Sequence, residues 1–311
     1  GEIRVTFVGH ATLLLQACGL NLLTDPIWTK RAGPFSLLGG PRFTDPGLAL
    51  DELPPVDGVL LSHGHYDHLD ARTVGLLRDR FGRELPWYTP LGYAPWLRKR
   101  GMRRVVELDW WDQVALEAPG GPAGERARLV CLPVRHWTRR GLRENRRLWC
   151  SWAVLPGDGH SVAADASDPT SGRGPGGSGS TPAGGGPDGR AVGGRAASRI
   201  PHPPDEPRGV YFGGDSGWCP CFADIGARLG PFRATLLPIG AYEPRWYMAP
   251  YHMNPEEAVR AYAVLGGRGA FVGMHWGAFR LTDEDPLEPP ERTREAWRAA
   301  GLAPGDLRLP G

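Results

Sequence analysis

Short apolar runs, separated by glycine-containing turns, alternate along the chain with segments whose apolar residues recur at helical spacing. The apolar runs predict strands at 3–8, 12–16, 21–24, 58–61, 105–108, 114–116, 127–133, 209–212, 235–238 and 270–274. The helical spacing predicts helices at 71–81, 93–100, 221–229, 255–265 and 290–300. Because strands and helices alternate through both halves, we expect a layered α/β protein.

One segment departs from this alternation. Between positions 166 and 194, 11 of 29 residues are glycine, and no Phe, Trp or Tyr occurs between Trp152 and Tyr211. Such a stretch cannot bury enough apolar surface to offset the entropy lost on ordering it. We therefore predict a disordered Gly/Pro/Ser-rich insertion at about 158–207, within a single domain formed by residues 1–311.

Composition and charge exclude several classes of protein. The 41% hydrophobic content is typical of a globular protein with a core, and the net charge is only +2, from 36 basic and 34 acidic residues. Without an overall polybasic field, no nucleic-acid partner is expected. Because no run reaches the ~18 to 20 apolar residues of a membrane-spanning helix, we expect no transmembrane segment.

The cysteines indicate a compartment. The chain has five, widely scattered, and they match neither a disulfide framework nor zinc-finger spacing: Cys18, Cys131, Cys150, Cys219 and Cys221. We therefore expect a reducing, intracellular location. Because the sequence begins with Gly rather than Met, we expect the natural N-terminus, with any targeting segment, to lie upstream.

The most informative motif, "HGHYDH", directly follows the predicted strand at 58–61. On a loop, His63 and His65 can point the same way, while Asp67 and His68 can turn toward a neighbouring point, so that one loop supplies two metal sites. Histidine nitrogen and carboxylate oxygen suit zinc, iron or manganese better than calcium or magnesium. A polar surface turn is the alternative, and the density of ligand types argues against it.

Three more residues of ligand type stand where later apolar runs end. His136 follows "RLVCLPVR", Asp215 follows "VYFGG" and His275 follows "AFVGM". Each alone could be an ordinary loop residue. Together they repeat one pattern, which indicates a single site assembled from several strand ends.

"HGHYDH", the later lone His, "GGDSG" and "MHWG" together resemble the metallo-β-lactamase superfamily. The resemblance implies an α/β fold, the αβ/βα sandwich of two mixed sheets flanked by helices, with two Zn²⁺ per chain at one edge and iron or manganese as alternatives. Its implied ligands for one metal are His63, His65 and His136. For the other they are Asp67, His68 and His275, with Asp215 bridging the two.

Longer stretches, among them "PIGAYEPRW" and "YHMNPEEAV", resemble the family of N-acylphosphatidylethanolamine-hydrolysing phospholipase D. This resemblance implies a zinc-dependent hydrolase that cleaves a phosphoric diester to N-acylethanolamine and phosphatidic acid, with a hydroxide between the metals as nucleophile. Asp67 and Asp215 would be catalytic. A phospholipid substrate, a homodimer and peripheral association with the cytoplasmic side of a membrane are also expected.

The segment from Trp246 to Asn254 predicts substrate contacts. His252 lies just upstream of a predicted helix N-terminus, where anions are favoured, so we assign it to the substrate phosphate or to proton delivery; a hydrogen-bonded loop histidine is the alternative. Asn254 before Pro is typical of a helix N-cap, with substrate binding as the other interpretation. Trp246, Tyr247 and Met248 could meet a lipid, although most aromatic clusters belong to a core.

Two further expectations concern the N-terminal part. The apolar patch at 34–38 is flanked by Lys30, Arg31 and Arg42, which could attract anionic headgroups. His10, in "VGHAT", follows the first predicted strand, and we expect it to orient a metal ligand or to be structural.

Other functions remain open. A narrow, polar pocket would favour a hydrolase of a small cyclic phosphate or a lactone within the same superfamily. An alternative hypothesis from a different functional class is a non-catalytic lipid-binding protein, but such a protein has no need of seven metal ligands. Redox chemistry at a di-iron centre is less favoured, because no flavin-binding module accompanies the domain.

Overall fold

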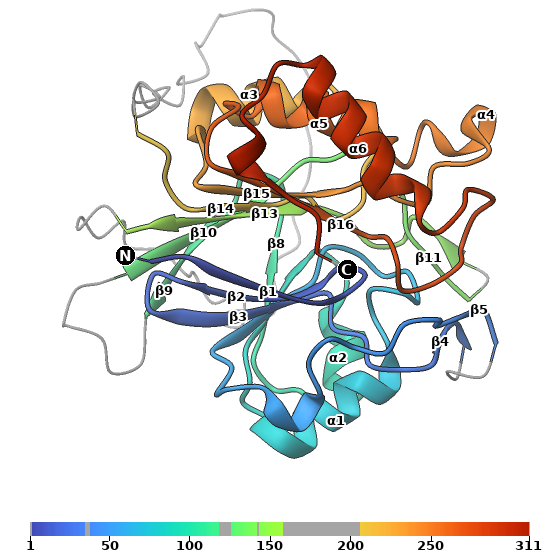
Figure 1. The fold of residues 1–311 in the computed structure, drawn as a ribbon. Coiled ribbons are helices and arrows are strands. Elements are labelled where there is room, and N and C mark those ends of the chain that lie inside the picture. Colours follow the sequence, from blue (N-terminus) through green and yellow to red (C-terminus); the bar gives the residue numbers. More distant parts are fainter. Residues whose placement is uncertain (1, 35–37, 118–125, 142, 158–205, 311) are drawn as a thin grey trace, which may run out of the picture.

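The structure, a computed structural model, describes residues 2–34, 38–117, 126–141, 143–157 and 206–310. Two β-sheets pack face to face, with helices on their outer sides (Figure 1). The predicted insertion at about 158–207 lies outside the described residues except for its last two positions, so its disorder and the single domain around it stay predictions.

The first sheet is built mainly from the N-terminal third of the chain. Its strands, in spatial order, are β1 (Arg4–Gly9), β2 (Thr12–Ala17), β3 (Leu20–Thr24), β6 (Gly58–Leu60), β7 (Trp87–Pro90) and β8 (Val105–Leu108). Strands β1 to β3 form an antiparallel meander, and β3, β6, β7 and β8 are parallel neighbours. The sheet is therefore mixed.

The second sheet repeats this arrangement with later strands. Its spatial order is β17 (Leu307–Arg308), β16 (Ala270–Met274), β15 (Ala234–Pro238), β14 (Val210–Phe212), β13 (Ser151–Pro156), β10 (Arg126–Leu132) and β9 (Gln113–Glu117). Parallel pairing joins β14 to β17, and antiparallel pairing joins β9, β10, β13 and β14. Two mixed sheets flanked by helices confirm the predicted fold class.

Helices cover the outer face of each sheet. Below the first sheet in Figure 1 lie α1 (Ala71–Phe81) and α2 (Ala94–Arg98), and above the second lie α3 (Cys221–Leu229), α5 (Pro255–Val264) and α6 (Glu288–Ala299). The short α4 (Arg245–Met248) projects at one side. The remaining elements are two small ribbons, β4 (Arg31–Ala32) with β5 (Gly40–Pro41) and β11 (Arg139–Arg140) with β12 (Arg143–Glu144), and the 3-10 helices η2 (Leu50–Glu52) and η3 (Pro304–Asp306).

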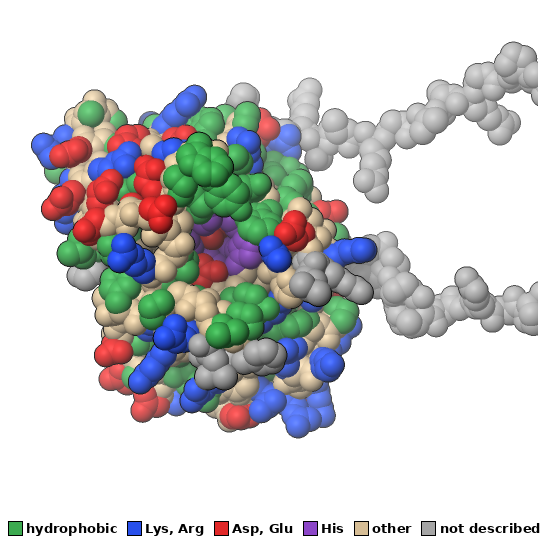
Figure 2. All heavy atoms as spheres, turned by 90° about the vertical axis from the view of Figure 1, so that its right-hand side faces the viewer, with side chains coloured by type: hydrophobic (Ala, Val, Ile, Leu, Met, Phe, Trp, Pro, Cys, Tyr) green, Lys and Arg blue, Asp and Glu red, His purple; other side chains and the backbone are tan. Residues whose placement is uncertain are grey.

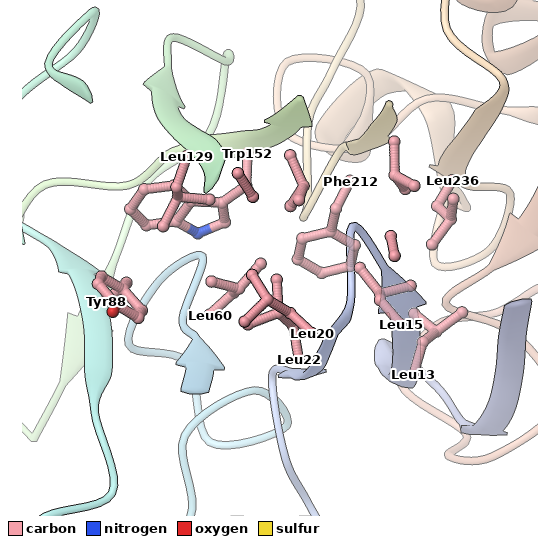
Figure 3. Close-up of a cluster of buried hydrophobic side chains, with 14 of the residues drawn as sticks. Leu13, Leu15, Leu20, Leu22, Leu60, Tyr88, Leu129, Trp152, Phe212 and Leu236 are labelled. Atoms are coloured by element: carbon pink, nitrogen blue, oxygen red, sulfur yellow. The ribbon is translucent and has the colours of Figure 1, made fainter. Parts of the chain in front are cut away.

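The main core fills the space between the sheets. Leu13 and Leu60 from the first sheet face Trp152 and Phe212 from the second, and all four side chains are fully buried (Figure 3). At about 25 cal/mol per Å² of apolar surface, such burial is the main term that holds the layers together. The packed sandwich is a rigid support for the loops at its edge.

Some elements differ from the sequence prediction. Strands β7 and β13 were not predicted, because "WYTP" is short and ends in Pro, and "SWAVLP" is apolar throughout and shows no alternation. Helix α6 begins at Glu288 rather than at 290, since Pro289 and Pro290 fit its first turn.

Two observations bear on expectations from the sequence, one on the cysteines and one on membrane-spanning segments. The structure joins Cys219 and Cys221 in a disulfide, so the expectation of no disulfide from cysteine spacing is wrong for this pair. None of the described helices combines the length and the apolar character that a membrane crossing needs.

Candidate metal centre

The predicted ligands all lie just beyond the ends of strands. The loop with His63, His65, Asp67 and His68 follows β6, and the other three ligands follow β10, β14 and β16: His136, Asp215 and His275. Figure 2, which views the molecule from the side on which α4 projects, shows histidine side chains at the floor of a hollow. The structure thus brings together all seven residues that the sequence singled out.

The first group consists of His63, His65 and His136. The Nδ1 atom of His65 lies 2.9 Å from His63 Nε2 and 3.2 Å from His136 Nε2. Burial is the main cause that lowers the pKa of each of the three rings, and for His63 the neighbouring histidines lower it further. Three neutral imidazoles with converging nitrogens are the donor set of a zinc-type site.

The second group consists of Asp67, His68 and His275. Asp67 Oδ2 lies 3.3 Å from His68 Nε2 and 3.5 Å from His275 Nε2. Burial alone would lower the pKa of His275, but the carboxylates of Asp215 and Asp67 together outweigh it and raise this pKa to about 9. Burial likewise opposes a charge on His68, yet Asp215 and Asp67 raise its pKa well above the ordinary value. The carboxylates therefore require positive charge here, which a bound cation would supply.

Asp215 lies between the two groups. Its Oδ2 is 3.0 Å from His68 Nε2 and 3.1 Å from His275 Nε2. The same oxygen is 3.7 Å from His63 Nε2 and 3.8 Å from His136 Nε2, while the buried Oδ1 has no hydrogen-bond partner in the described structure. One carboxylate that faces both groups, with an oxygen to spare, fits a ligand shared by two metals.

The outward nitrogens of three ligand rings are held from behind. His63 Nδ1 lies 2.9 Å from Ser62 Oγ, and His136 Nδ1 lies 2.9 Å from the carbonyl of Tyr251. Such partners select the tautomer that leaves the opposite nitrogen free for a metal.

Behind His68 stands Asp25, which sequence reasoning missed. Asp25 Oδ2 lies 2.7 Å from His68 Nδ1, and Asp25 Oδ1 accepts a hydrogen bond from the Ser62 backbone. Burial raises the pKa of this fully enclosed carboxyl. A signal existed in the sequence, because Asp25 directly follows the apolar run of β3, just as the predicted ligands follow apolar runs.

His10 lies against the second group. Its Nε2 is 2.9 Å from Asp67 Oδ2, and because a carboxylate only accepts, the imidazole donates. His10 and His275 have φ of 59° and 62°, in the left-handed region, and the His275 backbone donates to the His10 carbonyl. Strain of this kind is typical of residues held in place for function.

A cleft lies over the metal centre. Its floor includes His65, Asp67 and Asp215. Its walls are mostly aromatic or apolar and are formed by Trp137, Ala241, Tyr247, Met248, Tyr251, His252, Leu281 and Thr282. Hydrophobic side chains border the hollow above and below in Figure 2.

The predicted substrate residues divide into two kinds. Tyr247 and His252 line the cleft, and burial lowers the pKa of His252 to about 4, so its ring is neutral near pH 7. Trp246 does not line the cleft and is 84% exposed. Asn254 does not line the cleft either: its side chain accepts from the Glu257 backbone as the N-cap of α5, which confirms the cap interpretation, while its contact with substrate stays a prediction.

The expected attraction of anionic headgroups by the basic residues beside the 34–38 patch needs correction at Arg42. The Arg42 guanidinium donates to the carbonyls of Thr29 and Ile27 and packs 4.5 Å from the centre of the Phe279 ring. Because it is bound to its own chain, Arg42 is not free to attract headgroups. Residues 35–37 lie outside the described residues, and Lys30 and Arg31 are exposed.

Comparison with known proteins gives evidence on the family of this chain that is independent of the site geometry. The family profile described as "Beta-lactamase superfamily domain" matches residues 20–164 and 187–276. N-acyl-phosphatidylethanolamine-hydrolyzing phospholipase D 1 of Caenorhabditis elegans is 33% identical over 302 residues, which cover 94% of this chain and 69% of that protein. An uncharacterized protein of Mycobacterium tuberculosis is 37% identical over 94% of this chain and 63% of its own length.

Solved structures agree on the fold. A metallo hydrolase from Ignicoccus hospitalis superposes with a TM-score of 0.60 at 18% identity, covering 99% of this chain and 94% of that one. At this identity the likeness concerns the fold alone.

Proposed function

Because the chain belongs to the metallo-β-lactamase superfamily and is a metal-dependent hydrolase, we propose that it is a zinc-dependent phosphodiesterase of phospholipase D type. Its substrate is N-acylphosphatidylethanolamine, and its products are N-acylethanolamine and phosphatidic acid. The observation that carries this proposal is the 33% identity to the nematode enzyme of that name over most of this chain.

The chemistry of the cleft supports a lipid diester. Among the described residues that line it, none is Lys or Arg, and the walls include Trp137, Tyr247, Met248 and Leu281. Positive charge for a phosphate therefore has to come from metals on the floor. Apolar walls on either side accommodate apolar groups, whereas a small cyclic phosphate would be better served by polar walls.

Two bound zinc ions would lower the pKa of a water molecule to about 7 and neutralise charge that builds on the phosphate. The chain itself supplies positioning. The seven histidine and aspartate ligands would hold the metals, and Asp215 Oδ2 faces both groups of ligands. His252, neutral and on the cleft wall, hydrogen-bonds a phosphate oxygen or the leaving oxygen.

The rim of the cleft supports contact with a membrane surface. Trp246 is 84% exposed and Tyr247 is 50% exposed, and their ring centres lie 5.7 Å apart on α4. Aromatic side chains of this kind are favoured where an apolar phase meets water. Peripheral association with the cytoplasmic side of a membrane and a homodimer belong to the same proposal.

The test compares three substrates with purified, zinc-loaded protein: N-acylphosphatidylethanolamine in mixed micelles, bis-p-nitrophenyl phosphate, and a lactone. We expect about two zinc ions per chain and preferential release of N-acylethanolamine from the lipid. Asp67→Asn and His65→Ala should abolish turnover while the circular dichroism spectrum stays unchanged. Lipid turnover that survives both substitutions would refute the assigned site, and preference for the lactone would refute the substrate.

A further inference from the structure

Arg140, on β11, reaches from one ligand-bearing segment to the other. Its Nη1 donates to the carbonyl of Gly64 at 3.1 Å and to the carbonyl of Leu69 at 2.7 Å. Gly64 lies within the loop that carries the ligands and Leu69 directly follows it, so that His65, Asp67 and His68 stand between the two carbonyls. Arg140 itself lies four residues after His136, which comes from the second sheet.

The guanidinium of Arg140 is held between aromatic side chains. Its Cζ lies 4.6 Å from the centre of the Tyr66 ring and 4.4 Å from the centre of the Trp96 ring. Trp96 also carries the Arg100 guanidinium at 3.5 Å. The guanidinium is planar and can stack on both rings while one of its nitrogens donates to the two carbonyls, whereas the ammonium group of Lys has no plane with which to stack.

A second contact joins the same two segments. Thr138 Oγ1 accepts from the Gly64 backbone at 3.2 Å and lies 3.3 Å from the Tyr93 hydroxyl. A Cβ at position 64 would stand 2.9 Å from Tyr93 Cε1 and 3.0 Å from Thr138 Oγ1, so the approach depends on glycine. The segment after β10 and the loop after β6 are thus bound together at Gly64 and at Leu69.

The group of His63, His65 and His136 draws its nitrogens from both of these segments. The geometry of this group therefore depends on the relative position of the two segments. The hydrogen bonds of Arg140 fix that position. We propose that Arg140 is a positioning residue of the metal centre, which holds the His63–His68 loop in register with His136 and thereby raises the affinity for metal. This inference rests on the proposed metal site, but not on the proposed substrate.

The test uses the full chain, stripped of metal with a chelator, and zinc titrations in competition with a chromogenic chelator. Arg140→Met should weaken zinc binding by about 10–100-fold, the range typical of partners behind metal ligands. Arg140→Lys, which keeps the charge but not the planar group between the Tyr66 and Trp96 rings, should lose several-fold. The matched control is Arg139→Met, next in sequence and in an exposed ion pair with Glu144, which should change affinity by less than about twofold.

A spectroscopic reading separates positioning from general stability. With Co²⁺ in place of zinc, the ligand-field absorption reports the geometry of the coordinating groups, and it should change in Arg140→Lys but not in Arg139→Met. If Arg140→Met does not fold, Arg140→Lys decides the question alone. Zinc affinity and cobalt spectrum of Arg140→Lys equal to those of Arg139→Met would overturn the inference. A wild-type chain that binds no metal would instead refute the proposed function.

Discussion

The metal centre and the rim of the cleft above it are built in opposite ways. At the centre, His63, His68 and Asp215 are buried, and the outward ring nitrogens of His63 and His68 find partners in Ser62 and Asp25. At the rim, Trp246 is 84% exposed and contacts Tyr247 on a helix of four residues. The two regions adjoin one cleft, yet the centre is held by many contacts and the rim by few.

The difference assigns separate tasks. Buried ionisable groups are costly unless paired, so a cluster of five histidines and two carboxylates persists only because each is matched to another group or to a cation. Exposed aromatic residues cost little, and they are free to meet an apolar phase. We therefore expect substitutions at the centre to affect chemistry and metal binding, and substitutions at the rim to affect access to lipid.

The largest effect is expected when the carboxylate that faces both groups of metal ligands, that of Asp215, is removed. Asp215→Asn should lower kcat/KM by at least about a thousandfold, because the carboxylate that faces both groups is lost. Turnover and zinc content are measured together. The control, Asp79→Asn on the outer surface of α1, should leave both unchanged, since Asp79 is 66% exposed and pairs only locally with Arg78.

A substitution on the cleft wall probes the boundary between the two regions. His252→Gln should lower kcat by about a hundredfold, as expected when a group that serves the leaving oxygen is removed. Because His252 is outside the seven ligands, zinc content should stay at its wild-type value. A loss of metal in this variant would place His252 with the centre and remove its separate role.

A smaller effect, on zinc affinity, is expected from Asp25, which stands behind the ligand His68. Asp25→Asn removes the carboxylate behind His68 and should weaken zinc binding by about 10–100-fold in chelator competition. Asp57→Asn is the matched control, because Asp57 accepts a hydrogen bond from the Asn21 backbone at the other end of β3. Equal affinities in the two variants would contradict the orienting role of Asp25.

The rim should give the smallest effect, and one that depends on the substrate. Trp246→Ala should lower turnover of lipid in vesicles by roughly 3–10-fold and leave turnover of a soluble diester unchanged. The free energy of unfolding should stay within about 0.5 kcal/mol, because the side chain is exposed. Leu76→Ala, an exposed residue on α1, is the control, and equal losses in both variants would remove the rim from lipid contact.

Local patterns were sufficient for much of the fold. The apolar runs at 58–61 and 270–274 became buried strands, and the spacing at 71–81 became a helix with the predicted bounds. Strand β13 was not predicted, because a strand buried on both faces shows no alternation of apolar and polar residues. Asn254 shows the opposite case, because the local sequence signal correctly predicted the helix N-cap.

For the site, the sequence by itself determined which types of residue follow the strands, because the end of a hydrophobic run and the residues after it are local features of the sequence. It could not determine which groups meet. Asp215 faces both groups, Asp25 stands behind His68, and Arg140 donates to Gly64 and Leu69; each of these contacts joins residues 43 or more positions apart. Only the order of the strands and the packing of the two sheets bring such distant positions together, and these depend on the whole core at once.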